Sequence, residues 1–270
     1  MATKRRALGS TTDTGASEEE TMALRRTKIV LFGDSITQQA FSTKHSGWAA
    51  AVNDAYQRKV DIVNRGYSGY NTRWASQLVH EVSSHFASGS PANGRDILTI
   101  FFGANDASLA DGTAAAQHVP IAEYKANLGK LIDFVRSDHG SRAPQIVLIT
   151  PPPVHERSWA KFCGEETSNR SLEQSQRYAA ACKEVAAEKG LPVVDSWSAL
   201  HSKAQGDLEG LFWDGLHLSA RGNTLLYEAL MGVIQSSLPG LAPDALPLDA
   251  PLWRDIDPKN YESSFRAARF

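Results

Sequence analysis

The chain has 270 residues, with 28 Lys and Arg against 30 Asp and Glu, so its formal net charge of −2 provides no basic stripe for a nucleic-acid backbone. Apolar residues make up 42% of the chain and charged residues 21%, which allows a sizeable core and excludes global disorder. No apolar run approaches the roughly 20 residues that span a bilayer, and the N-terminus lacks the apolar stretch of a secretory signal peptide, so we expect a soluble cytoplasmic protein.

The N-terminal segment 1–27 is polar and carries both a basic run, Lys4-Arg5-Arg6, and an acidic run, Glu18-Glu19-Glu20. A segment of this composition buries too little apolar surface to become ordered, so we expect it to be disordered. A mitochondrial transit peptide is the functional alternative. The acidic run argues against it, because such peptides are poor in acidic residues.

From Lys28 onward, short β-rich runs alternate with helical patterns. The runs are nearly continuous in hydrophobicity, which favours strands buried on both faces of a parallel sheet over half-exposed hairpin strands. The expected strands are Lys28–Phe32, Val60–Asn64, Ile97–Phe102, Gln145–Thr150 and Leu191–Asp195.

Between these strands, apolar residues recur at spacings of three and four, as on one face of a helix. The three stripes consist of Trp74, Leu78, Val82 and Phe86; of Ile121, Tyr124, Leu128, Leu131, Ile132 and Val135; and of Leu172, Ser175, Ala179, Cys182 and Val185. A last helix is expected from Ser219, a suitable N-cap, to Leu238. Repeated strand–helix–strand units predict an α/β fold over 28–238, a three-layer α/β/α sandwich with a five-stranded parallel sheet.

The C-terminal segment 239–270 differs from the rest because prolines interrupt it and Trp253, Tyr261 and Phe265 are spaced along it. We expect it to pack on the body or on a partner subunit, in which case the protein is a homodimer; a disordered tail is the alternative. Cys163 and Cys182 have no metal-ligand spacing, and we expect both to be reduced, although the sequence leaves a disulfide between them open.

Small and polar residues follow each expected strand or, in the last case, a longer excursion after it. The segments are Gly33-Asp34-Ser35, Arg65–Asn71, Gly103-Ala104-Asn105-Asp106, Pro151–His155 and Trp213–His217. In open parallel sheets, ligands bind beyond the carboxyl ends of the strands. Turn chemistry explains any one of these segments, but it explains the whole set poorly, so we expect a site at this edge.

The residues in this set have the parts of a nucleophilic hydrolase. Ser35 is the candidate nucleophile, His217 the base, and Asp214 the group that orients the imidazole; a helix N-cap or turn serine is the structural alternative for Ser35. An acyl-transfer intermediate also needs preset N–H donors for its oxyanion. The backbone amides of Ser35 and Gly69 and the side-chain amide of Asn105 are suitable, and glycine at 69 allows a close approach to the substrate.

In these segments the sequence resembles the SGNH, or GDSL, hydrolase family. The family's four blocks are matched by GDS at 33–35, Gly69 in SGYNT, GxND at 103–106 and DxxH at 214–217. The longer segments FGDSITQ, NRGYSGYNT, FFGANDA and WDGLHLSARG are similar to those of the isoamyl acetate-hydrolysing esterase branch. The resemblance implies a flavodoxin-like sheet, no metal or other cofactor, and ester cleavage through an acyl-enzyme.

The resemblance also implies the roles of the residues. Ser35 is the nucleophile, His217 the base and Asp214 its partner, while the Ser35 and Gly69 amides and Asn105 form the oxyanion hole. Supporting positions in the same blocks are Asp34, Gly103 and Asp106. Ser68 lies in a sequence close to Gly-x-Ser-x-Gly that fails at its last position, and we expect it to be a turn residue.

We therefore predict a serine esterase acting on short-chain, acetate-type esters of small molecules. A carbohydrate O-acetyl esterase and an alcohol acyltransferase are alternatives within the same chemistry. A non-catalytic binding protein is the alternative from another class, but it would need a damaged site. A nucleotide-binding protein is not supported, because no glycine-rich phosphate loop follows any strand.

Several other residues near these segments have two interpretations. His155 either lines the pocket or lies on a surface loop, and the remaining histidines are expected to be solvated: His45, His80, His85, His118, His139 and His201. Five aromatic residues expected in loops near the site either wall an acyl or alcohol pocket or pack in the core: Phe41, Trp48, Trp159, Phe162 and Trp213.

Overall fold

The structure is a computed structural model and describes residues 26–86 and 96–267. The N-terminal segment that we expected to be disordered, 1–27, lies outside the described residues apart from its last two. No helix in the two described ranges is both long enough and apolar enough to cross a bilayer.

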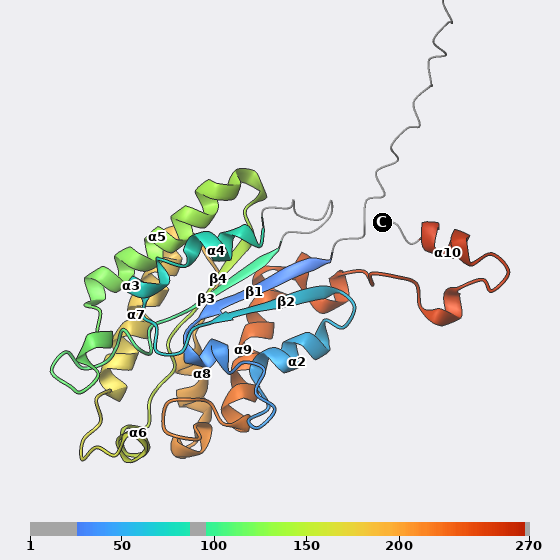
Figure 1. Cartoon of the computed structure of the whole chain (residues 1–270). Helices are drawn as coiled ribbons and strands as arrows, with labels where there is room; N and C mark the ends of the chain where they lie inside the picture. Colours follow the sequence, from blue (N-terminus) through green and yellow to red (C-terminus); the bar gives the residue numbers. More distant parts are fainter. Residues whose placement is uncertain (1–25, 87–95, 268–270) are drawn as a thin grey trace, which may run out of the picture.

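Within the described residues, five parallel strands form a single sheet in the order β2-β1-β3-β4-β5 (Figure 1). They are β1 (Thr27–Gly33), β2 (Val60–Gly66), β3 (Ile97–Phe101), β4 (Gln145–Ile149) and β5 (Val193–Val194). This order is the flavodoxin-like one, with β1 between β2 and β3. The predicted three-layer α/β/α sandwich is confirmed.

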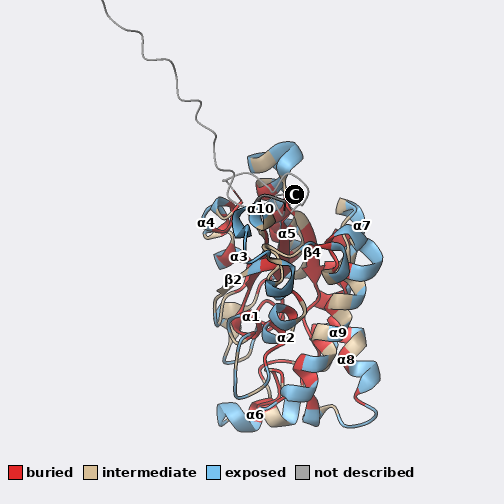
Figure 2. Cartoon of the chain, turned by 90° about the vertical axis from the view of Figure 1, so that its right-hand side faces the viewer, coloured by how far each residue is buried: buried red, intermediate tan, exposed pale blue. Residues whose placement is uncertain are grey.

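The period-two alternation of β1 divides the core into two halves. Ile29 and Leu31 face one cluster of buried side chains, and Val30 and Phe32 face the other. Burying a side chain of this size contributes about 1.5–3 kcal/mol, so both faces of the strand stabilise the fold. Figure 2 shows the buried interior between helices whose outer surfaces are exposed.

Helices cover both faces of the sheet (Figure 1). The face with Ile29 and Leu31 is covered by α2 (Trp48–Ala55), α8 (Ser196–Lys203) and α9 (Ala220–Ser237). The opposite face is covered by α3 (Thr72–Ala75), α4 (Val79–Ser84), α5 (Ile121–His139) and α7 (Leu172–Lys189). The remaining α-helices are α1 (Ser35–Gln38), α6 (Glu156–Cys163) and α10 (Tyr261–Ala267).

The long helices begin and end at residues suited to those positions. Ser171 caps α7 by accepting a hydrogen bond from Gln174 N, and Gly190 ends it in the left-handed region with a φ of 63°. Ser219 caps α9 through Gly222 N, as the sequence predicted. On α7, Cys182 is buried as a small core residue, and the structure describes it and Cys163 as free thiols.

Two expectations about these elements were wrong. The expectation that each strand is buried on both faces was wrong for β2. Its residues from 61 to 66 are mostly half-buried, because β2 is an edge strand with one neighbour. The stripe from Trp74 to Phe86 is not one helix, since α3 ends at Ala75 and α4 begins at Val79. Trp74 is 38% exposed and packs on Tyr70 rather than in the core.

The first part of the C-terminal segment lies on the body. Leu241 and Leu246 belong to the core that α9 covers, and Tyr56 Oη donates a hydrogen bond to Leu241 O at 2.7 Å. Asp249 then forms ion pairs with Arg26 and Arg58. Beyond this point the chain projects from the layers toward α10 (Figure 1), with Trp253 85% exposed. A homodimer formed through this segment stays a prediction.

Candidate active site

Ser35 lies where β1 ends and the first turn of α1 begins. Gly33 ends the strand so close to β3 that a Cβ there would lie 2.6 Å from Phe101 O. Asp34 is the N-cap of α1, and its Oδ1 accepts a hydrogen bond from Ile36 N at 2.9 Å. The Gly-Asp-Ser sequence therefore supplies a close approach, a cap and a hydroxyl in three consecutive positions.

Asp214 and His217 lie on a tight turn framed by an antiparallel bridge between Phe212 and Leu218. Asp214 Oδ1 accepts hydrogen bonds from Leu216 N at 2.9 Å and from His217 N at 2.7 Å, so the carboxylate organises its own turn. Gly215 has a φ of 101° and would bring a Cβ within 2.4 Å of Trp159 N. The turn thus requires glycine both for its conformation and for its contact with α6.

The structure brings Ser35, His217 and Asp214 together. Ser35 Oγ lies 2.8 Å from His217 Nε2, and His217 Nδ1 lies 2.5 Å from Asp214 Oδ2. The Asp214 side chain is fully buried, and the His217 side chain is 12% exposed. Burial alone would raise the pKa of Asp214, but the hydrogen bond and charge of His217 hold it below its usual range. An ionised Asp214 keeps the Nδ1 proton, which leaves Nε2 as an acceptor toward the serine.

The three expected oxyanion donors come from separate strand ends. Within the described residues, no hydrogen bond from the backbone amide of Ser35 or Gly69 is formed. Gly69 has a φ of 80°, a conformation that other residues adopt only with strain. Asn105 Nδ2 donates one of its two protons to Tyr70 O at 2.8 Å, and the other proton is uncommitted to any protein acceptor in the described ranges.

The supporting carboxylates, Asp34 and Asp106, are buried beside this arrangement. Burial raises the pKa of Asp34 to about 6 and that of Asp106 to about 7. In each carboxylate, one oxygen is hydrogen-bonded and Oδ2 is a buried atom without a partner in the described chain. Both groups therefore stabilise local structure through one oxygen at a desolvation cost to the charged form.

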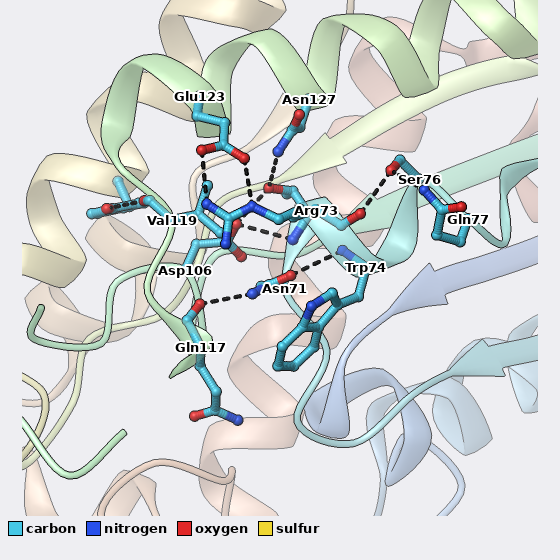
Figure 3. Close-up of polar contacts among 12 residues, drawn as sticks. Asn71, Arg73, Trp74, Ser76, Gln77, Asp106, Gln117, Val119, Glu123 and Asn127 are labelled. Carbon is cyan, nitrogen blue, oxygen red and sulfur yellow. Dashed lines mark hydrogen bonds and ion pairs between the residues drawn. The ribbon is translucent and has the colours of Figure 1, made fainter. Parts of the chain in front are cut away.

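Asp106 joins the loops that follow β2 and β3 (Figure 3). Its Oδ1 accepts hydrogen bonds from the backbone and the hydroxyl of Thr72, and Asn127 Nδ2 donates to the same hydroxyl at 3.2 Å. Gly103 opens this block with a φ of 132°, and a Cβ there would meet Pro151 and the hydroxyl of Tyr124. The GxND block thus positions Asn105 through the residues on either side of it.

Aromatic side chains surround His217. Trp213 stacks on the imidazole with ring centroids 5.6 Å apart, and it also stacks on His45, with centroids 5.2 Å apart. Trp159 meets the His217 ring edge-on, and Phe162 contacts both Trp159 and Trp213. The expectation that these aromatic residues all lie in loops was wrong. Three of them lie in helices: Trp48, buried in α2, and Trp159 and Phe162, on α6.

The remaining histidines are more engaged than expected. His155 is the N-cap of α6 and lies 2.8 Å from Ser158 Oγ through Nδ1. The expectation of solvation was wrong for His139, which is 8% exposed, and for His118, whose Nδ1 lies 2.6 Å from Ser108 O. Ser68 lies in an exposed turn, as predicted. The described residues contain no group of three or more side chains placed to hold a metal ion.

Sequence reasoning missed two residues beside the oxyanion donors, Arg170 and Gln117. Arg170 is buried and contacts Asn105 Oδ1, and Gln117 contacts both Arg170 and Gly69 O. Gln117 lies in no recognisable motif. Arg170 lies in Asn169-Arg170-Ser171, which has the form of an N-glycosylation sequon but gives no signal for a role at this site. Asn169 is buried and accepts a hydrogen bond from Trp159 Nε1, so it is a structural residue here.

Comparisons with known proteins agree with this geometry. Residues 31–225 match the model of the GDSL-like Lipase/Acylhydrolase family. A GDSL esterase/lipase of Arabidopsis thaliana is 41% identical over 90% of this chain and 99% of its own length. The isoamyl acetate-hydrolyzing esterase 1 homolog of Homo sapiens is 38% identical over 87% of this chain and 90% of that protein. The resemblance drawn from the four sequence blocks is confirmed.

Solved structures show the same fold. The lipase/acylhydrolase from Enterococcus faecalis matches with a TM-score of 0.58 and 26% identity, covering 82% of this chain and 98% of that one. The acetylxylan esterase Axe2 from Geobacillus stearothermophilus matches with a TM-score of 0.61 and 22% identity, covering 79% and 96%. At that identity the second likeness bears on the fold alone.

Proposed function

The chain belongs to the GDSL-like lipase/acylhydrolase family and is a carboxylic ester hydrolase, and from this premise we propose that Ser35, His217 and Asp214 are its catalytic triad. The observation that carries the proposal is the relay of contacts from Asp214 Oδ2 through the imidazole to Ser35 Oγ, with distances of 2.5 Å and 2.8 Å. The contact between Ser35 Oγ and His217 Nε2 has the separation that general-base activation of a serine requires, and the contact with Asp214 orients the imidazole.

In the proposed reaction, Ser35 Oγ attacks the ester carbonyl carbon while its proton moves to His217 Nε2. The carbonyl becomes a tetrahedral intermediate with a negative oxygen, and Asp214 stabilises the imidazolium that forms. The bond to the alcohol oxygen then breaks, and that oxygen takes the proton from Nε2. Water then reacts with the acyl-enzyme by the same steps: it gives a proton to Nε2, attacks the acyl carbon, and releases the acid as Ser35 regains its proton.

The proposed oxyanion hole consists of the Ser35 amide, the Gly69 amide and the side-chain amide of Asn105. It is supported by the absence of competing hydrogen bonds from the two backbone amides within the described chain. Such donors stabilise the intermediate more than the ground state because they point to where the charge develops. Removal of one donor of this kind costs about 10²–10³-fold in turnover.

We propose short-chain, acetate-type esters of small apolar alcohols as substrates. The names of two relatives, the isoamyl acetate-hydrolyzing esterase 1 homologs of Homo sapiens and Bos taurus, support this proposal. The chain's own support is the group of aromatic rings at His217. Phe162 is 55% exposed and Trp213 38% exposed, so apolar surface is available beside the residue that protonates the leaving alcohol.

The test is hydrolysis of p-nitrophenyl esters from acetate to octanoate, with isoamyl acetate and acetylated xylo-oligosaccharide as natural-type substrates. We expect turnover confined to the short acyl chains, isoamyl acetate preferred over the sugar ester, and loss of all these activities in Ser35→Ala. Preference for the sugar ester would identify a carbohydrate O-acetyl esterase. Ester formation with an added alcohol at the expense of acid release would identify an acyltransferase. No turnover of any ester by the wild-type chain would overturn the proposal.

A further inference from the structure

Arg170 lies behind the proposed oxyanion hole rather than inside it. The segment between α6 and α7 pairs with the GxND loop through an antiparallel bridge between Arg170 and Ser108. The residue is 4% exposed, and its guanidinium lies 4.9 Å from the centre of the Trp159 ring. A buried guanidinium is costly unless most of its donors are satisfied, so its partners indicate what holds it there.

Within the described residues, the four oxygens that accept hydrogen bonds from the Arg170 guanidinium are all uncharged. Nε donates to Ala104 O at 3.2 Å, and one terminal nitrogen donates to Asn169 Oδ1 at 2.8 Å. The other terminal nitrogen donates to Asn105 Oδ1 at 2.9 Å and to Gln117 Oε1 at 2.8 Å. Burial lowers the pKa of Arg170 to about 10, which still leaves the side chain positively charged at neutral pH.

The contact with Asn105 fixes the orientation of its amide. Because an arginine can only donate, Oδ1 must face Arg170, and Nδ2 must face the opposite way, toward Tyr70 O and the proposed hole. The positive charge on the carbonyl side also draws electron density from the amide, which makes the Nδ2 protons better donors to a developing anion.

The contact with Gln117 connects Arg170 to Gly69 as well. Gln117 Oε1 accepts from Arg170, and its Nε2 donates to Gly69 O at 3.0 Å. The backbone carbonyl of Gln117 in turn accepts from Asn71 Nδ2 at 2.9 Å, which anchors it to the loop after β2 (Figure 3). One terminal nitrogen of Arg170 is therefore linked to two of the three proposed donors. It contacts Asn105 directly and reaches Gly69 through Gln117.

We infer that Arg170 is a positioning residue that preorganises the oxyanion hole by holding Asn105 directly and Gly69 through Gln117. The inference rests on the proposed function, because it assigns a role relative to that hole. Arg170 touches no reacting atom in this scheme. Its effect should appear where the oxyanion forms and not in the binding of the ground-state ester.

The variants Arg170→Met and Arg170→Lys test the inference, with Arg177→Met as the matched control because Arg177 is exposed on α7 and contacts Gln174. We expect kcat for p-nitrophenyl acetate to fall about 10–100-fold in Arg170→Met, by analogy with the cost of losing one oxyanion donor, with KM within about threefold of wild type. Arg170→Lys keeps the charge but not the forked contacts, so its kcat should lie between those of the wild type and Arg170→Met. Arg177→Met should match the wild type.

Two readouts separate positioning from general damage. The affinity of a short alkyl boronic acid, which forms a tetrahedral adduct on the serine, should fall by the same factor as kcat/KM. Added guanidinium at millimolar concentration should restore part of the activity of Arg170→Ala. Unchanged kcat and boronate affinity in a folded Arg170→Met protein would overturn the inference, while activity in the wild type that is lost in Ser35→Ala would leave the proposed function standing.

If the Arg170 variants fail to fold, as thermal melting would reveal, Gln117→Leu decides the matter. Gln117 is half-buried, and its replacement severs the link to Gly69 while Arg170 and its other three acceptors remain. We expect kcat to fall about 5–10-fold with KM unchanged, a fraction of the loss of a full donor. A wild-type kcat in this variant would overturn the inference.

Discussion

Ser35, His217 and Asp214 have a counterpart elsewhere in the chain, where Ser83, His139 and Asp138 meet at the contact between α4 and α5. Ser83 Oγ donates to Asp138 Oδ2 at 2.5 Å and lies 2.8 Å from His139 Nε2. The residue types are the same in both clusters and the distances are similar. The clusters differ in which atoms face one another.

In the second cluster, His139 Nε2 also lies 3.0 Å from the backbone carbonyl of Ser83. A carbonyl only accepts, so Nε2 carries a proton and is unable to take one from the serine. In the first cluster the carboxylate faces Nδ1 instead, which places the proton there and leaves Nε2 free toward Ser35. The comparison teaches that the order of contacts around the imidazole, rather than the presence of three residue types, distinguishes a relay from a structural clasp.

The largest expected effect separates the two serines. Ser35→Ala should lower kcat by at least about three orders of magnitude, because among the described residues no other hydroxyl lies in hydrogen-bond contact with His217. Ser83→Ala should leave kcat within about twofold of wild type. Initial rates on p-nitrophenyl acetate measure both, with circular dichroism to establish folding. Substantial turnover by folded Ser35→Ala would remove Ser35 as the nucleophile.

The next effect separates the two aspartates. Asp214→Asn should lower kcat by about three to four orders of magnitude, since an amide facing Nδ1 favours the imidazole tautomer with its proton on Nε2. Asp138→Asn, in the second cluster, should not change kcat. The measurement is kcat at saturating ester for both variants. Equal, small losses in the two would mean that the contact between Asp214 and His217 is structural, like the one between Asp138 and His139.

The residues that form the candidate site were predictable from the sequence because each lies in a short motif that follows a strand or, for Asp214 and His217, a longer excursion after the last strand. Gly33, Gly69 and Gly215 supply the close approaches and left-handed conformations that those turns need, and local sequence records such needs directly. Parallel strands then bring the motifs to one edge without further information. This is why Ser35 and His217, 182 positions apart, were expected in contact.

What the sequence did not predict depends on packing between distant segments. Arg170 and Gln117 belong to no motif, and their role follows from which oxygens they meet in the folded chain. The break between α3 and α4 was missed because the spacing of Trp74 and Leu78 suits a helix, although Trp74 packs on Tyr70 outside the core. The burial of His139 was not predicted for the same reason, because its environment is formed by α4, a distant segment of the sequence.

A third effect concerns pH and the buried carboxylate Asp106, whose pKa burial raises to about 7. Between pH of about 4 and about 7, the folded chain retains a proton that the unfolded chain has released, so stability falls as pH rises through this window. Asp106→Asn removes the titration and should flatten the pH dependence by about 1–4 kcal/mol. Urea unfolding at pH 5 and pH 8 measures this difference.

Asp34, whose pKa burial raises to about 6, has the same sign and persists in this variant, so some pH dependence remains. An unaltered slope in Asp106→Asn would show that Asp106 is ionised in the fold.

The smallest expected effect returns to Ser83 and concerns stability rather than rate. Its hydroxyl is fully buried and joins Asp138 and His139 across the α4–α5 contact, so Ser83→Ala should lower the unfolding free energy by about 1–2 kcal/mol. Ser35→Ala removes one contact from a side chain that caps nothing, since Asp34 is the cap of α1, and should cost less than about 1 kcal/mol. Urea denaturation of the two variants gives both values. A larger loss in Ser35→Ala than in Ser83→Ala would mean that the first cluster, too, serves mainly to hold the fold together.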